Sequence, residues 1–186
     1  YMRPVEGNMW LKGVDIKEPG PDRVMVFQEF DQLLPWKTVK QNITFALMNG
    51  GKCKTQSEAD EIAMEYIKKV KLDRFEDTFP HMLSGGMKQR VAIARGMAME
   101  PDILLMDEPF SGVDPVGIEQ LQQTIRSLAK SGIGVLVTDH AVQATLGVCD
   151  RAIILDQGSV MAEGCPVEIV RNQMVRDRYL GVGFSL

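Results

Sequence analysis

The six residues ILLMDE, at positions 103–108, are four apolar side chains followed by two acids. A short, nearly continuous apolar run of this kind is typical of a strand buried in a parallel sheet. Two further runs have the same character, GVLVTDH at 134–140 and the shorter RVMVFQ at 23–28. An amphipathic helical pattern over 116–130 separates the first of them from ILLMDE. This alternation of strand, helix and strand predicts an α/β fold with a parallel sheet.

The segment between residues 37 and 99 carries helical patterns only, and we expect it to form a separate lobe. LLPWKTVKQNITFALMNGG, at 33–51, begins near a proline and closes at two glycines, as helices commonly do. Residues 57–70 place their apolar side chains on one helical face. A third helix is expected to run from SGG at 84–86 to about residue 99, before Pro101.

The last part of the chain predicts a hairpin over 151–164, with a Gln-Gly turn, and short helices over 166–171 and 173–180. We therefore expect an α/β core that an all-helical subdomain interrupts. The expected parts are residues 1–36 and 100–186 for the core and 37–99 for the helical subdomain.

Composition narrows the range of functions. The net charge is −4, which gives no reason to expect a nucleic-acid partner or a basic membrane-binding surface. The longest apolar runs, such as ILLM and GVLV, are far too short to span a bilayer. Cys53, Cys149 and Cys165 have neither metal-ligand nor redox spacing, and we expect free thiols in a reducing compartment.

Polar side chains close each of the three predicted strands. Gln28 follows the first, Asp107 and Glu108 follow the second, and Asp139 and His140 follow the third. Open parallel sheets bind their ligands beyond the carboxyl ends of the strands. One site can therefore collect all of these side chains.

Each of these side chains has a chemical and a structural interpretation. In phosphate-transfer sites an acid such as Asp107 holds Mg²⁺, while a second, such as Glu108, orients or deprotonates water. The alternative for Glu108 is a cap on the turn before Pro109. His140 can donate a hydrogen bond to a γ-phosphate, or it is a surface residue. Gln28 can contact a metal and a water, or it caps a loop.

Ser84, Gly85 and Gly86 open a predicted helix. Serine is a good N-cap, and the two glycines let the backbone approach a ligand closely. A helix N-terminus with accessible amides suits a phosphate. The alternative is a plain helix start that happens to contain glycine.

Taken together, LSGGMKQR, DEP, SGVD and TDH, in this order and spacing, strongly resemble the motifs of the ATP-binding cassette (ABC) transporter ATPases. Met87 stands where the family's signature motif commonly has glutamine. The corresponding motifs are the signature at Leu83–Met87, Walker B at Ile103–Glu108, the D-loop at Ser111–Asp114, the switch histidine at His140 and the Q-loop glutamine at Gln28. The resemblance covers essentially the whole chain.

The resemblance implies a P-loop NTPase-like (RecA-like) fold, the cofactors ATP and Mg²⁺, and a head-to-tail dimer of two ATPase subunits. It implies that Ser84, Gly85 and Gly86 bind the γ-phosphate of the partner's nucleotide and that Asp114 couples the two sites. Glu108 is then the base and His140 the γ-phosphate sensor, while Asp107 and Gln28 serve Mg²⁺. Transmembrane permease subunits are the implied partners, at the cytoplasmic face of the membrane, where the ATPase is peripheral.

The family also needs a P-loop, G-x-x-x-x-G-K-[ST], and the 186 residues contain no such sequence. YMRPVEGNMWLKG, at 1–13, resembles the stretch that follows the P-loop helix and leads to a β-hairpin. We therefore expect an N-terminally truncated family member that binds ATP very weakly and hydrolyses little of it alone.

The two halves resemble different transporters. GPDRVMVFQ (20–28) and residues 33–47 resemble ATPases of nitrate, sulfonate and taurine importers. TDHAVQATLGVCDRAIILDQG (138–158) and VRDRYLGVGFSL (175–186) look closer to the lipopolysaccharide-export ATPase, with parts shared by branched-chain amino-acid importers. The Q-loop and helical lobe contact the permease in the family, so the first half favours import of a small anion.

Two rival interpretations remain open. A DNA-repair or translation ATPase of the same family tends to carry a long coiled coil or two cassettes, and the roughly 55 residues between Gln28 and Ser84 leave no room for a long coiled coil. A non-catalytic module would offer only its signature turn to a partner, and it would not need Glu108 or His140.

Overall fold

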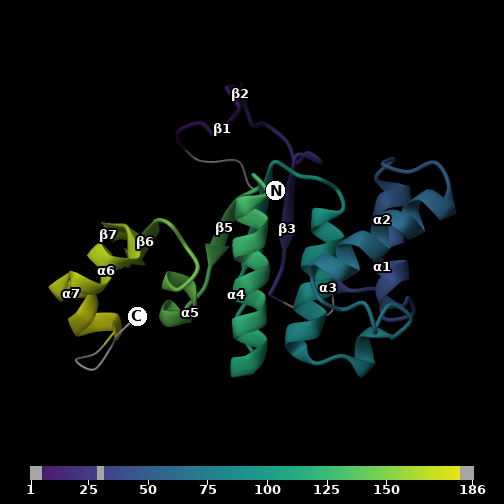
Figure 1. Ribbon diagram of the computed structural model, residues 1–186. Helices are drawn as coiled ribbons and strands as arrows, with labels where there is room; N and C mark the ends of the chain where they lie inside the picture. Colours follow the sequence, from purple (N-terminus) through teal and green to yellow (C-terminus); the bar gives the residue numbers. More distant parts are fainter. Residues whose placement is uncertain (1–5, 29–31, 181–186) are drawn as a thin grey trace.

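Three parallel strands lie at the centre of the computed structural model, which describes residues 6–28 and 32–180 (Figure 1). They are β3 (Arg23–Val26), β4 (Ile103–Asp107) and β5 (Gly134–Thr138), in the spatial order β3-β4-β5. In this register Leu105 lies between Met25 and Leu136. The predicted parallel sheet is confirmed, and the ILLMDE stretch supplies its central strand.

Three helices form the middle of the chain: α1 (Val39–Asn49), α2 (Gln56–Lys69) and α3 (Gly85–Met97). Ile43, Leu47 and Ile67 are fully buried where α1 and α2 meet the core. The helical run expected after the proline of the 33–51 stretch is present as α1, and a capping box of Thr38 and Gln41 fixes its first turn at Val39.

The loop before α1 is held by a side chain instead of by helical hydrogen bonds. Asn42, which is fully buried, donates to the carbonyl oxygens of Leu34 and Lys37 and accepts a hydrogen bond from the Leu34 amide. A short 3₁₀ turn at Pro80–Met82 then leads into α3.

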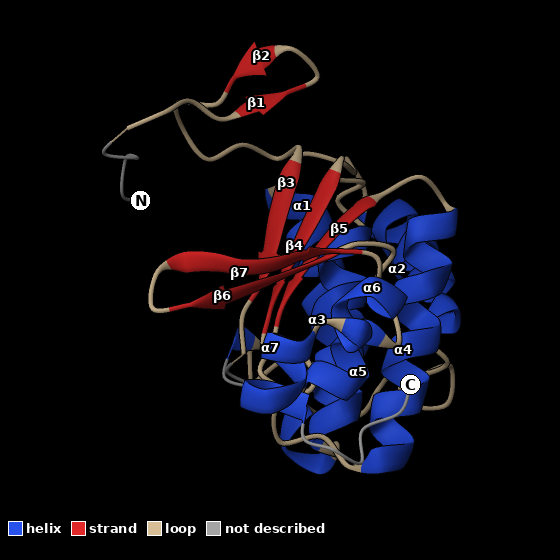
Figure 2. Cartoon of the chain, turned by 90° about the vertical axis from the view of Figure 1, so that its left-hand side faces the viewer, coloured by secondary structure: helices blue, strands red, loops and turns tan. Residues whose placement is uncertain are grey.

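Helix α3 packs directly on the sheet, and α4 (Pro115–Lys130) lies beside it on the same side (Figure 2). Gly96 makes the close approach possible, because a Cβ atom there would lie 3.1 Å from side-chain atoms of both Leu104 and Val24. On this covered face Leu104 is fully buried and Met106 is 1% exposed. The main core therefore sits between the sheet and the helices.

The opposite face of the sheet is open. Met25 is 44% exposed and Leu136 is 55% exposed, although both are apolar strand residues. The expectation that GVLVTDH forms a buried strand is wrong for this face, because the helices α3 and α4 cover only the other one. The strands are also shorter than expected, since β3 ends at Val26 and β5 at Thr138.

The remaining elements flank this core. The predicted C-terminal hairpin is present as β6 (Ala152–Asp156) and β7 (Ser159–Gly164), and the helical turn α5 (Val142–Leu146) precedes it without having been predicted. Then follow α6 (Pro166–Arg171), α7 (Gln173–Val175) and a π-helical turn, Arg176–Leu180. Near the N-terminus, two antiparallel strands of two residues each, β1 (Trp10–Leu11) and β2 (Val14–Asp15), form a short hairpin.

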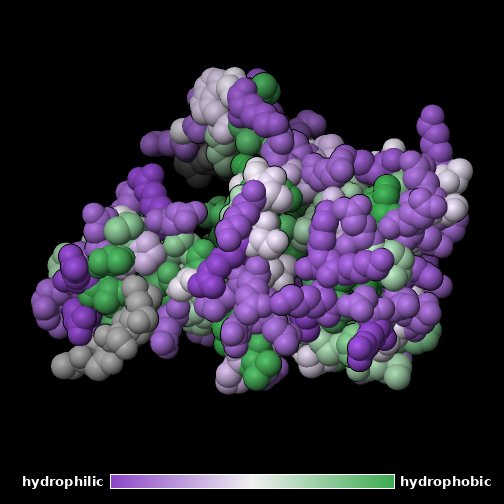
Figure 3. Space-filling model, in the orientation of Figure 1, coloured by the Kyte–Doolittle hydropathy of each residue, from purple (hydrophilic) through white to green (hydrophobic). Residues whose placement is uncertain are grey.

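Residues 1–5 and 181–186 of the two terminal stretches quoted above lie outside the described part. Hydrophilic side chains dominate the outer face over α2 and α4, while hydrophobic ones reach the surface around β7, α6 and α7 (Figure 3). Within the described residues, every helix is too short or too polar to cross a membrane.

Candidate functional site

The carboxyl ends of β3, β4 and β5 bring together three of the predicted side chains. The amide nitrogen of Gln28 donates to Glu108 Oε2 at 2.8 Å and to Ser111 Oγ at 3.2 Å. His140 Nδ1 lies 3.3 Å from the same Glu108 oxygen. Glu108 is therefore the centre of the cluster, and residues from three loops converge on it.

The backbone of Glu108 is unusual. Its φ is +43°, a left-handed conformation that side chains with a Cβ atom rarely adopt. Its amide donates to the Thr138 carbonyl at 2.7 Å, and its carbonyl accepts from the Ser111 amide at 3.1 Å. These bonds hold the strained turn and direct the carboxylate toward Gln28 and His140.

Asp107 belongs to the same edge of the sheet, one residue before the turn. Its Oδ1 accepts a hydrogen bond from the Thr138 hydroxyl at 2.8 Å, which ties the end of β4 to the end of β5. The second carboxylate oxygen has no hydrogen bond among the described residues and is available to a cation.

Asp139 is the one buried carboxylate of the strand-end group, with a side chain that is 0% exposed. Its Oδ2 accepts from the Phe110 amide at 2.8 Å, and its Oδ1 accepts from the Ala141 amide at 2.7 Å. Both oxygens therefore accept from the backbone, and Oδ1 also lies 3.7 Å from His140 Nδ1.

The second group of predicted residues lies at the N-termini of α3 and α4. Ser84 is the N-cap of α3, and its side chain accepts from the Met87 amide at 3.3 Å. Asp114 caps α4 through the Gly117 amide at 2.9 Å. A Cβ atom on Gly86 would lie 3.1 Å from Val113 and 3.4 Å from Gly117, so the two helix starts touch.

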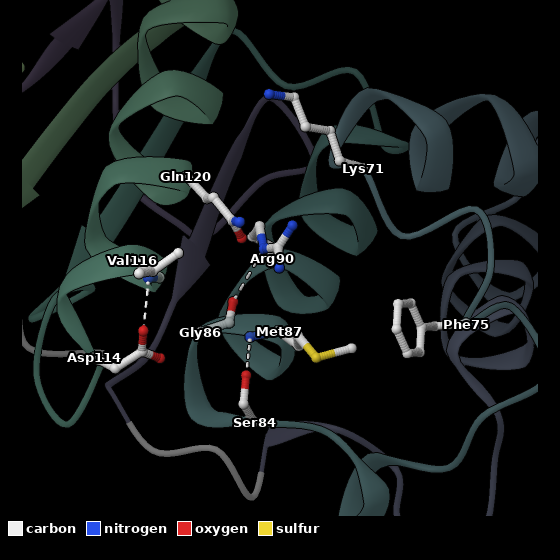
Figure 4. A pocket seen from close by; sticks show the side chains of 10 residues that line it. Lys71, Phe75, Ser84, Gly86, Met87, Arg90, Asp114, Val116 and Gln120 are labelled. Carbon is white, nitrogen blue, oxygen red and sulfur yellow. Dashed lines mark hydrogen bonds between the residues drawn. The ribbon is translucent and has the colours of Figure 1, made fainter.

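A cavity of about 380 Å³ opens beside this contact (Figure 4). Arg90 lines it although it is only 6% exposed, and its Nη1 donates to the Val70 carbonyl at 2.9 Å. Burial lowers the pKa of the Arg90 guanidinium, and the nearby Asp114 carboxylate opposes that shift. Phe75 and Lys71 stand on the other side of the cavity from Asp114.

The structure thus sorts the predicted residues into two groups. Gln28, Glu108 and His140 are in direct contact, with Asp107 joined to them through Thr138, whereas Ser84, Gly85, Gly86 and Asp114 form the second group. Within the described chain, no hydrogen bond links Ser84 or Gly86 to Glu108 or His140. The cavity beside the α3 and α4 N-termini is lined by Ser84, Gly86 and Asp114, while Glu108 and His140 are not among its lining residues.

Sequence reasoning missed three contributions. Ser111 and Thr138 hold Gln28 and Asp107 but were read only as parts of motifs, and Asp139 was read only as the polar end of a strand. Asp139 was detectable in principle, because an Asp at the start of a loop commonly accepts a hydrogen bond from the amide two residues later and forms an Asx turn. Its bond to Phe110, 29 residues away, has no local sequence signal.

The residues at the strand ends fit a partly solvated magnesium ion. Among the described residues, no group of three or more His, Cys, Asp or Glu side chains can hold a metal. Mg²⁺ commonly takes only one or two protein oxygens and completes its shell with phosphates and water. The amide oxygen of Gln28 and the second oxygen of Asp107 are donors of this kind, and the hydrogen bonds of these side chains leave both available.

Comparison with known proteins identifies relatives. The family model described as "ABC transporter" matches residues 1–111. The lipopolysaccharide export system ATP-binding protein LptB of Acidithiobacillus ferridurans is 47% identical over 129 residues, which are 69% of this chain and 54% of that protein. The nitrate import ATP-binding protein NrtC of Synechococcus elongatus is 40% identical over 168 residues, 90% of this chain and 25% of its own length. The chain therefore spans about half or less of these two relatives.

Solved structures support the same fold. CbiO1 from Clostridium perfringens, described as part of the ABC transporter complex cbiONQ, superposes with a TM-score of 0.83 at 26% identity, over 95% of this chain and 72% of that one. A dimeric ATP-binding cassette, MJ0796, in a post-hydrolysis state with ADP and Pi has a TM-score of 0.74 at 29% identity, over 88% and 75%. The predicted P-loop NTPase-like fold is confirmed.

Proposed function

Because the chain belongs to the ABC transporter family, we propose that it is the ATP-binding subunit, or part of one, that powers transport by hydrolysing ATP. The observation that carries this proposal is the convergence of Gln28, Glu108 and His140 at the carboxyl ends of three parallel strands, with contacts of 2.8 and 3.3 Å to one carboxylate oxygen. This edge of an open parallel sheet is where such folds bind ligands.

Glu108 is the base in this proposal. Its carboxylate is 35% exposed, so water can reach it, and two neighbours hold it in place. A base must lie within hydrogen-bond reach of the water it activates, and the strained turn presents the carboxylate outward from the strand end. His140 is the proposed γ-phosphate contact, and its 71% exposed side chain beside Glu108 supports that role.

Asp107 and Gln28 are the proposed protein ligands of Mg²⁺, through the oxygens that their hydrogen bonds leave available. When bound, Mg²⁺ supplies positive charge beside the β- and γ-phosphates of ATP. The role of this chain is to hold those two oxygens at the sheet edge. The Asp107–Thr138 and Gln28–Ser111 hydrogen bonds supply that support.

Ser84, Gly85 and Gly86 are proposed to bind the γ-phosphate of a nucleotide held by a second ATPase subunit. The dimeric state of the MJ0796 relative supports this, as does the cavity at the α3 N-terminus, which Ser84 and Gly86 line without Glu108. The α3 N-terminus offers backbone amides and a favourable dipole to a phosphate. Asp114, in the loop between Glu108 and the α3–α4 contact, would couple the two sites of a head-to-tail dimer.

A permease is the proposed membrane partner, with the chain peripheral at the cytoplasmic face. Support comes from exposed apolar side chains in and beside the helical lobe. Trp36 is 69% exposed, Met82 is 66% exposed and Phe45 is 44% exposed, which is unusual for a surface that meets only water.

The proposed cargo is a small anion of the nitrate or sulfonate type, taken up by import. The nitrate import relative matches 90% of the chain, including the Q-loop and helical lobe, whereas the lipopolysaccharide-export relative matches 69%. A lipopolysaccharide-export or branched-chain amino-acid type ATPase is the alternative. Transport by membrane vesicles that contain the matching permease, with nitrate and taurine as competing solutes, decides between them.

A second candidate function is a non-catalytic subunit that supplies only its signature turn. Such a subunit would use the α3 N-terminus at Ser84 and its contact with the start of α4. The experiment joins a P-loop strand and helix from a family member to the N-terminus of this chain and measures phosphate release from ATP. We expect hydrolysis that Glu108→Gln lowers by about 100-fold or more while binding of a fluorescent ATP analogue persists.

Glu65→Gln on α2 is the matched control, because it removes an exposed carboxylate that pairs with Lys69 on the same helix. Hydrolysis that Glu108→Gln leaves at the level of the Glu65→Gln control contradicts the assignment of Glu108 as the base. No hydrolysis in the chimera, together with stimulation of a P-loop-bearing partner, favours the non-catalytic function.

A further inference from the structure

Asp139 is a buried charge that the proposed reaction does not use directly. Its side chain is 0% exposed and accepts two hydrogen bonds, from the amides of Phe110 and Ala141. A carboxylate in such a position is costly unless hydrogen-bond donors satisfy it, and charged acceptors form the stronger class of hydrogen bond. Each oxygen thus has a backbone partner, and the side chain is closed to solvent.

The two amides belong to the two loops that carry the proposed catalytic side chains. Phe110 follows Glu108 by two residues, and its ring is anchored in the core at 3% exposure. Ala141 directly follows His140. One carboxylate therefore spans the turn of Glu108 and the loop of His140.

The two hydrogen bonds differ in their structural effect. The bond to Ala141 joins residues two apart and is an ordinary Asx turn, which any surface loop can contain. The bond to Phe110 joins residues 29 apart and connects the ends of two neighbouring strands. Only the second bond fixes one loop relative to the other.

We propose that Asp139 is a positioning residue that clamps the Glu108 turn to the His140 loop and so keeps Glu108 Oε2 and His140 Nδ1 in contact at 3.3 Å. The proposal deepens the proposed function, on which the importance of that contact rests. Without the clamp, the backbone bond from the Glu108 amide to the Thr138 carbonyl still joins the strands, but the residues beyond it are free to separate.

The test is amide hydrogen exchange by NMR on the 186-residue chain and its Asp139→Asn variant. Asparagine keeps the shape but replaces one acceptor oxygen with a donor, so one of the two amides loses its bond. We expect exchange at Phe110 or Ala141 to accelerate about tenfold or more, while amides in the centre of α3 change less than about twofold.

Asp77→Asn is the matched control, because it removes the same charge from a side chain that is 82% exposed. The proposal is overturned if a folded Asp139→Asn variant keeps wild-type exchange at both amides. It is equally overturned if the wild-type chain lacks a scalar coupling across the hydrogen bond between the Phe110 amide nitrogen and the Asp139 carboxyl carbon. This second measurement needs no variant, so a variant that fails to fold does not stop the test.

Failure of the clamp and failure of the proposed function are distinguishable. The amide measurements need no nucleotide and report only on the two loops. Phosphate release by the P-loop chimera and its Glu108→Gln variant reports on hydrolysis, whatever the exchange rates at Phe110 and Ala141.

Discussion

The two faces of the central sheet differ sharply in how far their apolar side chains are buried. Leu104 and Met106 on one face are at most 1% exposed beneath α3, while Leu136 and Met25 on the other are about half exposed. Both sets of residues come from equally apolar sequences. An apolar strand sequence thus indicates a preference for burial. Whether a given face is buried depends on the elements that pack on it, which here are α3 and α4 on one face.

Leu104→Ala should have the largest effect. Leu104 is fully buried, so its loss leaves a cavity and should lower the free energy of unfolding by about 2–5 kcal/mol. Leu136→Ala on the open face should cost about 0.5 kcal/mol or less, because the side chain is already half in water. Urea denaturation measures both. Equal losses for the two variants would mean that something covers the open face in solution.

Gly96→Ala should come next. The added methyl group would lie 3.1 Å from Leu104 and Val24, so α3 must move away from the covered face, at a cost of about 1–3 kcal/mol. Gly134→Ala on β5 is the control, since its nearest neighbours would lie at 3.4 and 3.5 Å. The melting temperatures of both variants measure the effect. Equal decreases for the two variants would argue against close packing of α3.

Leu136→Lys should change association more than stability. A charge in the middle of the open face breaks the apolar row formed with Leu105 and Met25. We expect less self-association in sedimentation velocity and a midpoint of urea unfolding close to that of the wild type. Unfolding of the variant at low urea would instead place Leu136 in a buried environment.

The smallest expected effect concerns α6, in the C-terminal part of the chain. Hydrogen bonds from Cys165, first from its backbone amide, lower the pKa of Glu168 below its ordinary value of 4.5. A lowered folded-state pKa stabilises the protein above pH 4.5, and this contribution disappears as the pH falls through the folded-state value. The melting temperature of Glu168→Gln should therefore differ from that of the wild type at pH 7 and converge with it at low pH. A difference that persists at low pH would contradict the cap.

Much of the fold was predictable because its signals are local. The ILLMDE stretch, the amphipathic pattern of α4 and the Gln-Gly turn each specify their own element. The exposure of Leu136 was not predictable, because it depends on what packs above the strand. The start of α1 at Val39 was not specified, because Thr38 and Gln41 were not recognised as a capping box.

The candidate site divides in the same way. Glu108, His140 and Gln28 were identified from motifs, and their mutual contact follows from the parallel sheet. The assignment of Ser84, Gly85, Gly86 and Asp114 to a partner's nucleotide stays a prediction. The role of Asp139 depends on a bond to Phe110, and a contact between residues 29 apart is a property of the folded chain.

The left-handed backbone of Glu108 has a consequence for directed evolution. Glycine adopts a φ of +43° without strain and asparagine with little, so either should make the chain more stable than glutamate does at this position. A library randomised at residue 108 and selected only for heat resistance should drift toward these two residues. The same library selected for phosphate release should return glutamate. Thermal stability and ATP hydrolysis therefore favour different residues at position 108.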